Sequence, residues 1–229
     1  MEVLGLIPAR SGSKGLKNKN IQKLLGKPLV EYTINSAKKS RYLNKIIVST
    51  DSKKIAKIGL DLGVDVPFIR PKKLAQDDSS TLSVVKHTLD FLSKKYDYAP
   101  DIITILQPTS PLRKTKTIDQ SIELLIKTDA TMVLGVHTIK SNPYASFALR
   151  KKYLKPVKKD FEKYHQRQKF PNFYFPTGSV YTFWGKTLKK YGSIYGPRIK
   201  PLIIDDKTII DIDNKLDLFL CEMIMKYKR

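Results

Sequence analysis

The chain has 229 residues, of which 41% are hydrophobic, enough to bury the core of a single α/β domain. Its 43 lysines and arginines against 21 acidic residues give a formal net charge of +22. This charge is compatible with nucleic acid, an anionic surface or a small anionic substrate as partner. It does not choose among them, because the lysines are scattered through nearly every segment.

The same composition excludes several classes of protein. No window of about 18 uncharged apolar residues exists, and the start MEVLGLIPAR is too short for a signal peptide and lacks its basic region. We therefore expect a cytoplasmic protein with no membrane segment. Cys221 is the single cysteine, which excludes a disulfide or zinc framework, and its apolar neighbours at helical spacing predict that it is buried.

Strands and helices are predicted to alternate along most of the chain. Apolar runs of strand length occur at residues 3–7, 45–49, 64–69, 102–106 and 131–136, and stripes of helical period at 29–37, 55–62 and 82–92. This alternation predicts an α/β fold with a mostly parallel sheet and helices on both faces. Ligands of such folds bind at the carboxyl ends of the strands.

The pattern fails between residues 142 and 172, where prolines, aromatic residues and a basic cluster replace the long periodic segments. We predict one domain over residues 1–229, with an arm at about 142–172 inserted within it. After the arm, TGSVYTFW returns to strand alternation, and a closing helix is expected at about 214–226.

The segment ARSGSKGLKNKN, residues 9–20, follows the first predicted strand and is called the opening loop below. Gly12 and Gly15 allow backbone N–H groups to approach an anion, Ser13 adds a hydroxyl donor, and lysines supply charge. The loop matches neither Walker A, because Leu16 follows the second glycine, nor the G-x-G-x-x-G fingerprint. By itself it is equally readable as a basic surface loop.

Five stretches, in order along the chain, resemble the motifs of one known protein family. IPARSGSKGLKNKN resembles the signature I-P-A-R-x-G-S-K-G-[LI]-x-x-K-N of the sialic acid cytidylyltransferases, also called CMP-N-acylneuraminate synthetases. VSTDS, RPKKLAQDDSST, LQPTSPLR and IDIDNKLDL match the same family in the expected order, so the resemblance covers nearly the whole chain. It implies a Rossmann-like three-layer nucleotidyltransferase fold with a small protruding dimerisation arm.

The resemblance assigns the opening loop to the triphosphate of CTP. The implied phosphate or nucleotide contacts are Arg10, Ser13, Lys14, Lys19 and Asn20. Cations there would stabilise charge that develops on the α-phosphate and the leaving pyrophosphate. Lys17 falls where the family varies and is assigned to solvent.

The stretch RPKKLAQDDSST resembles the family's cytosine and ribose site, with Arg70, Ser79 and Thr81 near the base. The residues also allow a structural reading, in which Asp78 or Ser79 caps a helix beginning near Thr81. Both readings can hold together.

The segment IDID predicts a magnesium site. Residues i and i+2 of an extended chain project to one side, so Asp211 and Asp213 can face one cluster of phosphate oxygens. Two hard carboxylates suit Mg²⁺, which also accepts water and phosphate ligands. The alternative is that these aspartates cap the final helix. Asp217 is predicted either to be structural or to support the metal ligands without binding the ion itself, and Asp205 with Asp206 is a competing pair without a family motif.

The sugar site follows from the resemblance at three positions, Gln107, Arg167 and Tyr181. An arginine binds a carboxylate through two parallel hydrogen bonds, which a lysine cannot copy. Thr177 stands where many members have asparagine, and Ala145 where some have lysine, so the identity of the sugar stays open. Arg113 is readable as a sugar-site residue or as a loop-anchoring ion pair.

The implied activity is Mg²⁺-dependent transfer of CMP from CTP to the anomeric hydroxyl of a nine-carbon 2-keto-3-deoxy sugar acid, N-acetylneuraminate or a relative. The implied catalytic residues are Arg10, Lys14, Lys19, Asp211 and Asp213. The family usually dimerises through its arm, so a homodimer is expected. The three histidines, His87, His137 and His165, show no metal-ligand spacing and are predicted to be structural.

Four alternatives stay open. Legionaminate or pseudaminate could replace neuraminate as acceptor. A relative acting on Kdo is disfavoured because its opening resembles I-P-A-R-x-x-S-[ST]-R-[LF]-P, and a hexose-1-phosphate transferase normally carries a G-x-G-T-R loop that is absent here. A basic nucleic-acid-binding protein would explain the charge but leaves IDID and LQPTSPLR without a role.

Overall fold

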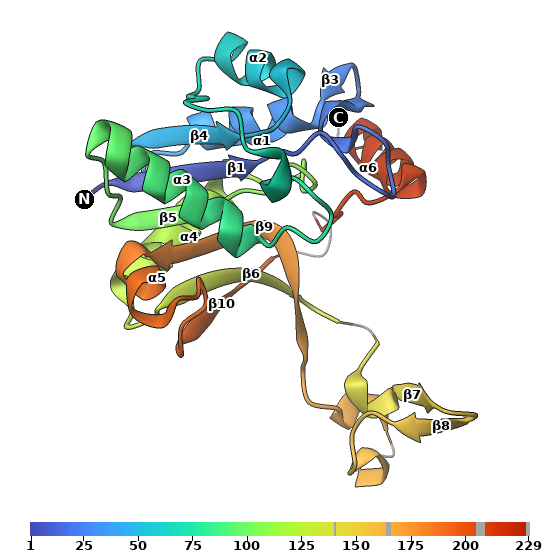
Figure 1. Ribbon diagram of the computed structural model, residues 1–229. Helices are drawn as coiled ribbons and strands as arrows, with labels where there is room; N and C mark the ends of the chain where they lie inside the picture. Colours follow the sequence, from blue (N-terminus) through green and yellow to red (C-terminus); the bar gives the residue numbers. More distant parts are fainter. Residues whose placement is uncertain (140, 164–165, 205–208, 228–229) are drawn as a thin grey trace.

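The computed structural model describes residues 1–139, 141–163, 166–204 and 209–227 (Figure 1). Six strands form the central sheet in the order β10-β6-β9-β5-β1-β4. They are β1 (Val3–Pro8), β4 (Lys45–Ser49), β5 (Ile102–Ile105), β6 (Met132–Thr138), β9 (Tyr174–Trp184) and β10 (Ile199–Ile203). β9 runs antiparallel to its neighbours β5 and β6, whereas the other pairs are parallel. The predicted mostly parallel α/β sheet is therefore confirmed.

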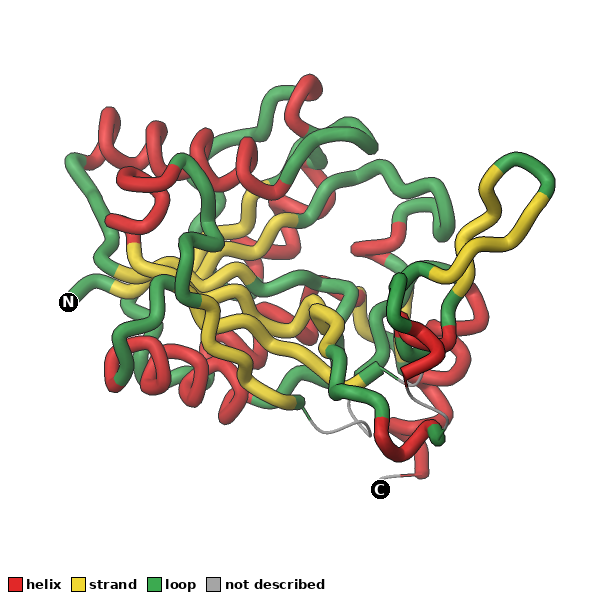
Figure 2. Tube along the Cα trace, turned by 90° about the horizontal axis from the view of Figure 1, so that it is seen from below, coloured by secondary structure: helices red, strands yellow, loops and turns green. Residues whose placement is uncertain are grey.

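Helices cover both faces of this sheet, as Figure 2 shows. One face packs on α1 (Leu29–Lys38), α2 (Lys53–Asp61) and α4 (Thr115–Lys127), the other on α3 (Thr81–Tyr96) and α5 (Gly185–Tyr191). The alternation along β1 explains the two cores, because Val3 and Ile7 belong to the first cluster and Leu4 and Leu6 to the second. All four side chains are essentially fully buried.

The predicted elements agree with this architecture in most places. The segment 64–69 is the exception among the strands: it forms isolated parallel bridges to Ile47 and Thr50 alongside β4 instead of a strand. The helices α4 and α5 were not predicted. In α4 a signal was present, because Ile118, Ile122 and Leu125 recur at helical spacing and are buried against the sheet.

A third core cluster lies under α6 (Lys215–Tyr227) and joins the two ends of the chain. Its buried members are Leu16, Leu24, Leu29, Ile212 and Cys221. They bring together the opening loop, the small hairpin of β2 (Lys23–Leu24) and β3 (Lys27–Pro28), and the segment before α6. Burial raises the pKa of the Cys221 thiol to about 12, which fits the predicted inert, buried cysteine.

Between β6 and β9 the chain leaves the sheet and forms an arm that protrudes from the body (Figure 1). The arm contains the hairpin of β7 (Phe147–Arg150) and β8 (Tyr153–Pro156) and the 3₁₀ turns η3 (Pro143–Ala145), η4 (Phe161–Lys163) and η5 (Arg167–Lys169). Leu149, Tyr153 and Leu154 on the hairpin are 70%, 74% and 66% exposed. In the part of the chain that the structure describes, no helix has the length and apolar character needed to cross a membrane.

Candidate active site

The opening loop emerges from the carboxyl end of β1 and is tied to the neighbouring strand end. The N–H of Ala9 donates to the carbonyl of Ser49, and Ser11 donates its N–H and hydroxyl to the Asp51 carboxylate at 2.7 and 2.5 Å. Buried Asn20 donates its amide to the carbonyl of Arg10 at 2.8 Å. The loop is thus held in a fixed course before any ligand binds.

The three cations predicted to bind phosphate are each paired with a carboxylate. Arg10 lies 2.7 Å and Lys14 3.4 Å from the two oxygens of Asp77, and Lys19 lies 2.9 Å from Asp213. Lys17, predicted to face solvent, is exposed. Arg10, Lys14 and Lys19 therefore carry a counter-charge that an anionic ligand could replace.

The segment 210–213 lies against this loop. Ile212 donates its N–H to the carbonyl of Thr109 at 2.9 Å and is buried, while Asp211 and Asp213 on either side are exposed. A Cβ at Gly15 would stand 2.3 Å from the carbonyl oxygen of Asp213, so a larger residue would push the two segments apart. The predicted alternation, with the carboxylates on the open side, is confirmed.

The pKa of the Asp211 carboxyl group is raised, although solvent reaches this residue. Desolvation of its carboxyl group by the surrounding protein raises its pKa, and the neighbouring Asp213 and Asp217 raise it further. A hydrogen bond from Thr109 and the charge of Lys19 act in the opposite direction without cancelling the rise. A cation bound here would offset the free-energy cost of ionising Asp211.

Asp217 has the structural role predicted for it. Its carboxylate accepts from the N–H groups of Asp213 and Asn214 at 2.8 and 2.9 Å, and its own N–H donates to the Asn214 side chain at 3.0 Å. This reciprocal pair caps α6. Asp211 and Asp213 are therefore not needed as caps.

Gly178, near the middle of β9, lies between residues predicted for the sugar site and for the metal site. Its φ of +70° is the left-handed conformation that favours glycine. A Cβ there would stand 2.8 Å from Oε1 of Gln107, 3.0 Å from Oγ of Ser110 and 3.4 Å from Oδ2 of Asp211. The predicted sugar contact Gln107 and the predicted metal ligand Asp211 thus both lie beside Gly178.

Tyr181 follows in β9, opposite Ile105. Burial raises the pKa of its hydroxyl to about 12, with smaller contributions from Tyr195 and the Asp211 carboxylate. Tyr181 is therefore neutral at physiological pH and belongs to the same charged neighbourhood as Asp211.

Arg113 anchors the turn after β5 through hydrogen bonds, and no ion pair of Arg113 occurs within the described part of the chain. Its buried guanidinium donates to the carbonyl of Ser179 at 2.5 Å, to the hydroxyl of Thr33 at 3.2 Å and to the carbonyl of Gln107. Burial lowers its pKa to about 9, against the favourable charge of Asp211. Arg113 thereby fixes the backbone of Gln107, the predicted sugar contact, and that of Ser179 in β9.

Arg70 and Ser79 make structural contacts in the region assigned to cytosine and ribose. Buried Arg70 donates to the hydroxyl of Ser49 at 3.1 Å, to its carbonyl, and to the carbonyl of Leu74 at 3.3 Å; burial lowers its pKa to about 10. Ser79 accepts from the N–H of Gln76 and donates to the carbonyl of Lys73. Their contacts with a nucleotide stay predictions.

The predicted helix cap was wrong by one or two residues. Ser80, not Asp78 or Ser79, is the N-cap of α3, and its hydroxyl accepts from the N–H of Ser83. Ser79 is instead engaged in closing the preceding loop, and Thr81 is the first helical residue. Single-residue positions of caps depend on loop geometry that adjacent serines do not reveal.

Thr177 and Ala145, the two positions that depart from the family pattern, lie in different parts of the fold. Thr177 is buried, and its hydroxyl donates to the carbonyl of Gly135 at 3.2 Å, opposite the irregularity in the β6–β9 pairing. Ala145 belongs to η3 of the arm. Arg167 begins η5, but its side chain lies outside what the structure describes, as do His165, Asp205 and Asp206.

The remaining histidines fit the structural role predicted for them. His87 packs edge-on against Phe68, with ring centroids 4.7 Å apart, and burial lowers its pKa. His137 meets Phe175 in the same way at 6.1 Å. Among the described residues, no group of three or more histidine, cysteine or acidic side chains is arranged to hold a metal.

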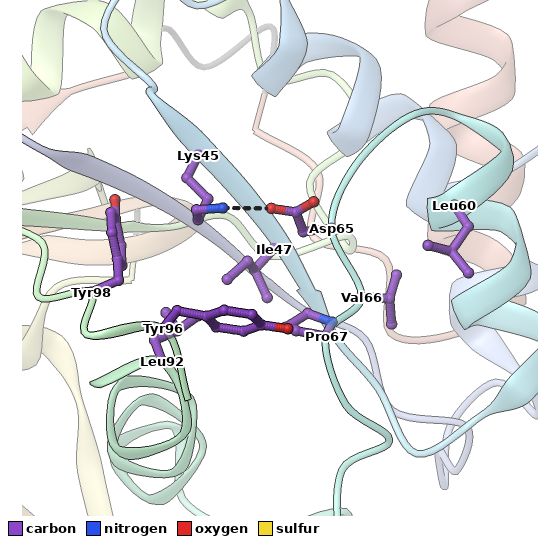
Figure 3. A pocket seen from close by; sticks show the side chains of 9 residues that line it. All are labelled: Lys45, Ile47, Leu60, Asp65, Val66, Pro67, Leu92, Tyr96 and Tyr98. Atoms are coloured by element: carbon purple, nitrogen blue, oxygen red, sulfur yellow. Dashed lines mark hydrogen bonds and ion pairs between the residues drawn. The ribbon is translucent and has the colours of Figure 1, made fainter. Parts of the chain in front are cut away.

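A separate cavity of about 520 Å³ lies by the amino end of β4 (Figure 3). An ion pair between Lys45 and Asp65, 2.9 Å apart, borders it, together with Ile47, Pro67, Tyr96 and Tyr98. None of the predicted site residues lines it, and the carboxyl strand ends lie at the opposite edge of the sheet. It does not compete with the site around Gly178.

The sequence missed three residues of this site: Asp51, Asp77 and Gly178. The first two lie inside stretches that match the family, VSTDS and RPKKLAQDDSST, but their partners are in the opening loop, which only the folded chain brings near. Gly178 lies in the stretch TGSVY, which resembles the family pattern, but neither the resemblance nor the strand alternation gives this glycine a role in the site.

Comparison with known proteins agrees with this geometry. Residues 4–211 match the family described as Cytidylyltransferase. A CMP-N,N'-diacetyllegionaminic acid synthase from Legionella pneumophila is 36% identical over 99% of this chain and 97% of that protein. An N-acylneuraminate cytidylyltransferase from Escherichia coli is 31% identical over 99% of this chain and 53% of that protein.

A solved structure supports the fold independently. The CMP:2-keto-3-deoxy-manno-octonic acid synthetase in complex with CTP superposes with a TM-score of 0.74 at 15% identity, covering 100% of both chains. At this identity the likeness shows the shared fold alone. The family match and the two relatives establish that this chain belongs to the cytidylyltransferase family, as its resemblance to the sialic acid members implied.

Proposed function

We propose that the chain transfers CMP from CTP to the anomeric hydroxyl of a nine-carbon 2-keto-3-deoxy sugar acid and releases pyrophosphate. One observation carries the proposal: the opening loop, the turn after β5 and the segment 210–213 converge at the carboxyl edge of the sheet around Gly178. The legionaminate and neuraminate enzymes among the relatives support the nine-carbon class of acceptor.

The chain's own residues account for positioning and for charge. Arg10, Lys14 and Lys19 would exchange their carboxylate partners for phosphate oxygens and stabilise the charge that passes to pyrophosphate. Gln107, fixed by the contact of Arg113 with its carbonyl, would orient the acceptor sugar. The sugar hydroxyl then attacks the α-phosphorus directly, with no covalent enzyme intermediate.

Asp211 and Asp213 fit a magnesium ion. Both carboxylates face the open side of one segment. The pKa of Asp211 is raised by desolvation and by the neighbouring Asp213 and Asp217, and this nearby negative charge supports a cation at the position. Mg²⁺ bound there would neutralise phosphate oxygens. Two protein carboxylates suffice, because this ion takes its remaining ligands from phosphate and water.

Two further expectations belong to the proposal. A homodimer assembled through the arm would bury the exposed apolar hairpin residues and bring Arg167 to a partner's sugar pocket. The cytoplasm remains the expected location.

The test is a substrate panel. The protein is incubated with Mg²⁺, each of the four nucleoside triphosphates, and N-acetylneuraminate, legionaminate, pseudaminate or Kdo, and pyrophosphate release is measured. We expect release with CTP and at least one nine-carbon acid. No release from CTP with any acid refutes the proposal, and release with Kdo alone changes the acceptor class. Steeply salt-dependent duplex binding without turnover would favour a nucleic-acid-binding protein.

A further inference from the structure

The carboxylate of Asp77 forms ion pairs with both Arg10 and Lys14 of the opening loop. Asp77 lies in the loop between η2 (Lys72–Leu74) and α3, and its two oxygens are divided between Arg10 at 2.7 Å and Lys14 at 3.4 Å. Desolvation disfavours the ionised form of Asp77, but hydrogen bonds from the two cations outweigh it and lower its pKa. Two anionic oxygens between two cations is the arrangement that a phosphate group would also adopt.

We propose that Asp77 is an internal competitor of the nucleotide: it occupies Arg10 and Lys14 in the free protein and is displaced when a triphosphate binds. This inference rests on the proposed function of the opening loop. It adds a residue that limits the affinity for nucleotide and that the family resemblance did not assign.

The ion pairs are of a kind that exchanges readily. The side chains of Arg10 and Asp77 are 30% and 39% exposed, and that of Lys14 is 85% exposed. Exposed ion pairs of this type contribute little to stability, whereas a triphosphate offers several charged oxygens to the same donors. Displacement of Asp77 is therefore favourable once the nucleotide is in place.

The loop that carries Asp77 does not depend on these ion pairs. Ser79 accepts from the N–H of Gln76 at 3.0 Å and donates to the carbonyl of Lys73 at 3.2 Å, and Arg70 holds the carbonyl of Leu74. Asp77 can thus release its partners without unfolding the loop. Asp51 differs, because it accepts from the backbone N–H of Ser11, which fixes the loop's course and not its charge.

A neighbouring residue provides the matched control. Asp78 is exposed and adjacent, and the structure describes no ion pair for it. Asp77→Asn and Asp78→Asn change the net charge equally, so a difference between them measures the contact and not the overall field. Asp77→Glu keeps the carboxylate and should retain wild-type affinity. Thermal melting checks that all variants are folded.

Isothermal titration calorimetry without sugar measures the dissociation constants for Mg²⁺·CTP and, separately, for inorganic tripolyphosphate. We expect Asp77→Asn to bind both anions about two- to fivefold more tightly than the wild type, as loss of a competing exposed ion pair implies. Asp78→Asn should raise the affinity by a clearly smaller factor than Asp77→Asn.

Two results would overturn the inference. In the first, Asp77→Asn binds tripolyphosphate no more tightly than Asp78→Asn does. In the second, Asp77→Asn binds tripolyphosphate more weakly than the wild type, which would make Asp77 an orienting residue. Failure of the proposed function is distinguishable. A wild-type protein that binds tripolyphosphate but neither binds nor turns over CTP refutes that function, while the comparison on tripolyphosphate still decides the role of Asp77. Wild-type protein that binds neither anion overturns both.

Discussion

The ammonium group of Lys19 lies 2.9 Å from a carboxylate oxygen of Asp213, although 194 positions separate them in the sequence. The side chain of Lys19 is only 14% exposed, whereas that of Asp213 is 72% exposed. The lysine is therefore held by the fold while its partner stays open to solvent. This contact joins the predicted phosphate site to the predicted metal site.

The first prediction concerns Lys19, with Lys17 as its matched control. Lys19→Met should lower kcat/KM for CTP by about 10²-fold or more, because it removes a positioned charge from the developing pyrophosphate. Lys17→Met removes the same charge from a side chain that is exposed and lies two residues away in the sequence. Its kcat/KM for CTP should stay within about twofold of the wild-type value. Steady-state pyrophosphate release measures both. An equal loss in the two variants would mean that only the overall charge matters.

The second prediction concerns the pH dependence at Asp211. Its pKa is raised in the folded chain, so ionising it costs stability, and that cost grows as pH rises from the unfolded-state value of about 3.9 through the folded pKa. Asp211→Asn should therefore melt at a higher temperature than the wild type at pH 7. The difference should shrink as the pH falls toward 4. Differential scanning calorimetry from pH 4 to 8 without metal measures it.

Asp213→Asn is the control for this result. Asp213 has an ion pair with Lys19, so its substitution should not raise the melting temperature. Both variants should lose turnover by about 10²-fold or more if they hold Mg²⁺ as proposed. A melting temperature of Asp211→Asn equal to or below that of the wild type at pH 7 contradicts the raised pKa.

Much of the fold was predictable because its causes are local. Strands such as residues 3–7 and 45–49 are apolar runs bounded by turn residues, and their burial follows directly from composition. The segment 64–69 has the same character but bridges β4 at only two places, since pairing depends on the partner strand. The antiparallel direction of β9 likewise results from the arm before it, whose path no local pattern specifies.

The site was predictable in part, for a related reason. The resemblance assigned phosphate contacts to Arg10, Lys14 and Lys19, and these contacts stay predictions. In the structure Arg10 and Lys14 pair with Asp77, and Lys19 pairs with Asp213. The resemblance could not predict which carboxylate each cation meets, because these contacts are long-range. Asn20 was predicted to touch nucleotide, yet its amide is occupied by the carbonyl of Arg10, a contact that sequence alone does not reveal.

The third prediction compares two glycines with left-handed backbones. Gly192 has φ of +63° and open space around its Cβ position, so Gly192→Ala should cost about 1–2 kcal/mol of backbone strain and leave turnover unchanged. Gly178→Ala should cost more, because its Cβ also meets Gln107 and Ser110. It should lower turnover at least tenfold by displacing Gln107. Urea denaturation and pyrophosphate release measure these effects, and full turnover in Gly178→Ala would show that the surroundings of Gly178 do not belong to the site.

The last prediction tests the arm as a dimer interface. Leu149 and Leu154 on the β7–β8 hairpin are 70% and 66% exposed, a degree of apolar exposure that an interface would relieve. Light scattering after size exclusion should give twice the 26.2 kDa chain mass for the wild type at micromolar concentration. The double variant Leu149→Asp, Leu154→Asp should elute as a monomer, because two charges cannot be buried in an apolar contact without partners.

Leu60→Asp on α2 is the matched control, since Leu60 is 59% exposed but lies on the body and not on the arm. It should leave the mass at that of the dimer. If the arm also completes a partner's sugar pocket, the monomeric double variant should retain CTP binding but lose turnover with the sugar acid. A wild-type monomer, or a double variant that stays dimeric, contradicts the arm as the interface and leaves its exposed apolar residues for another partner.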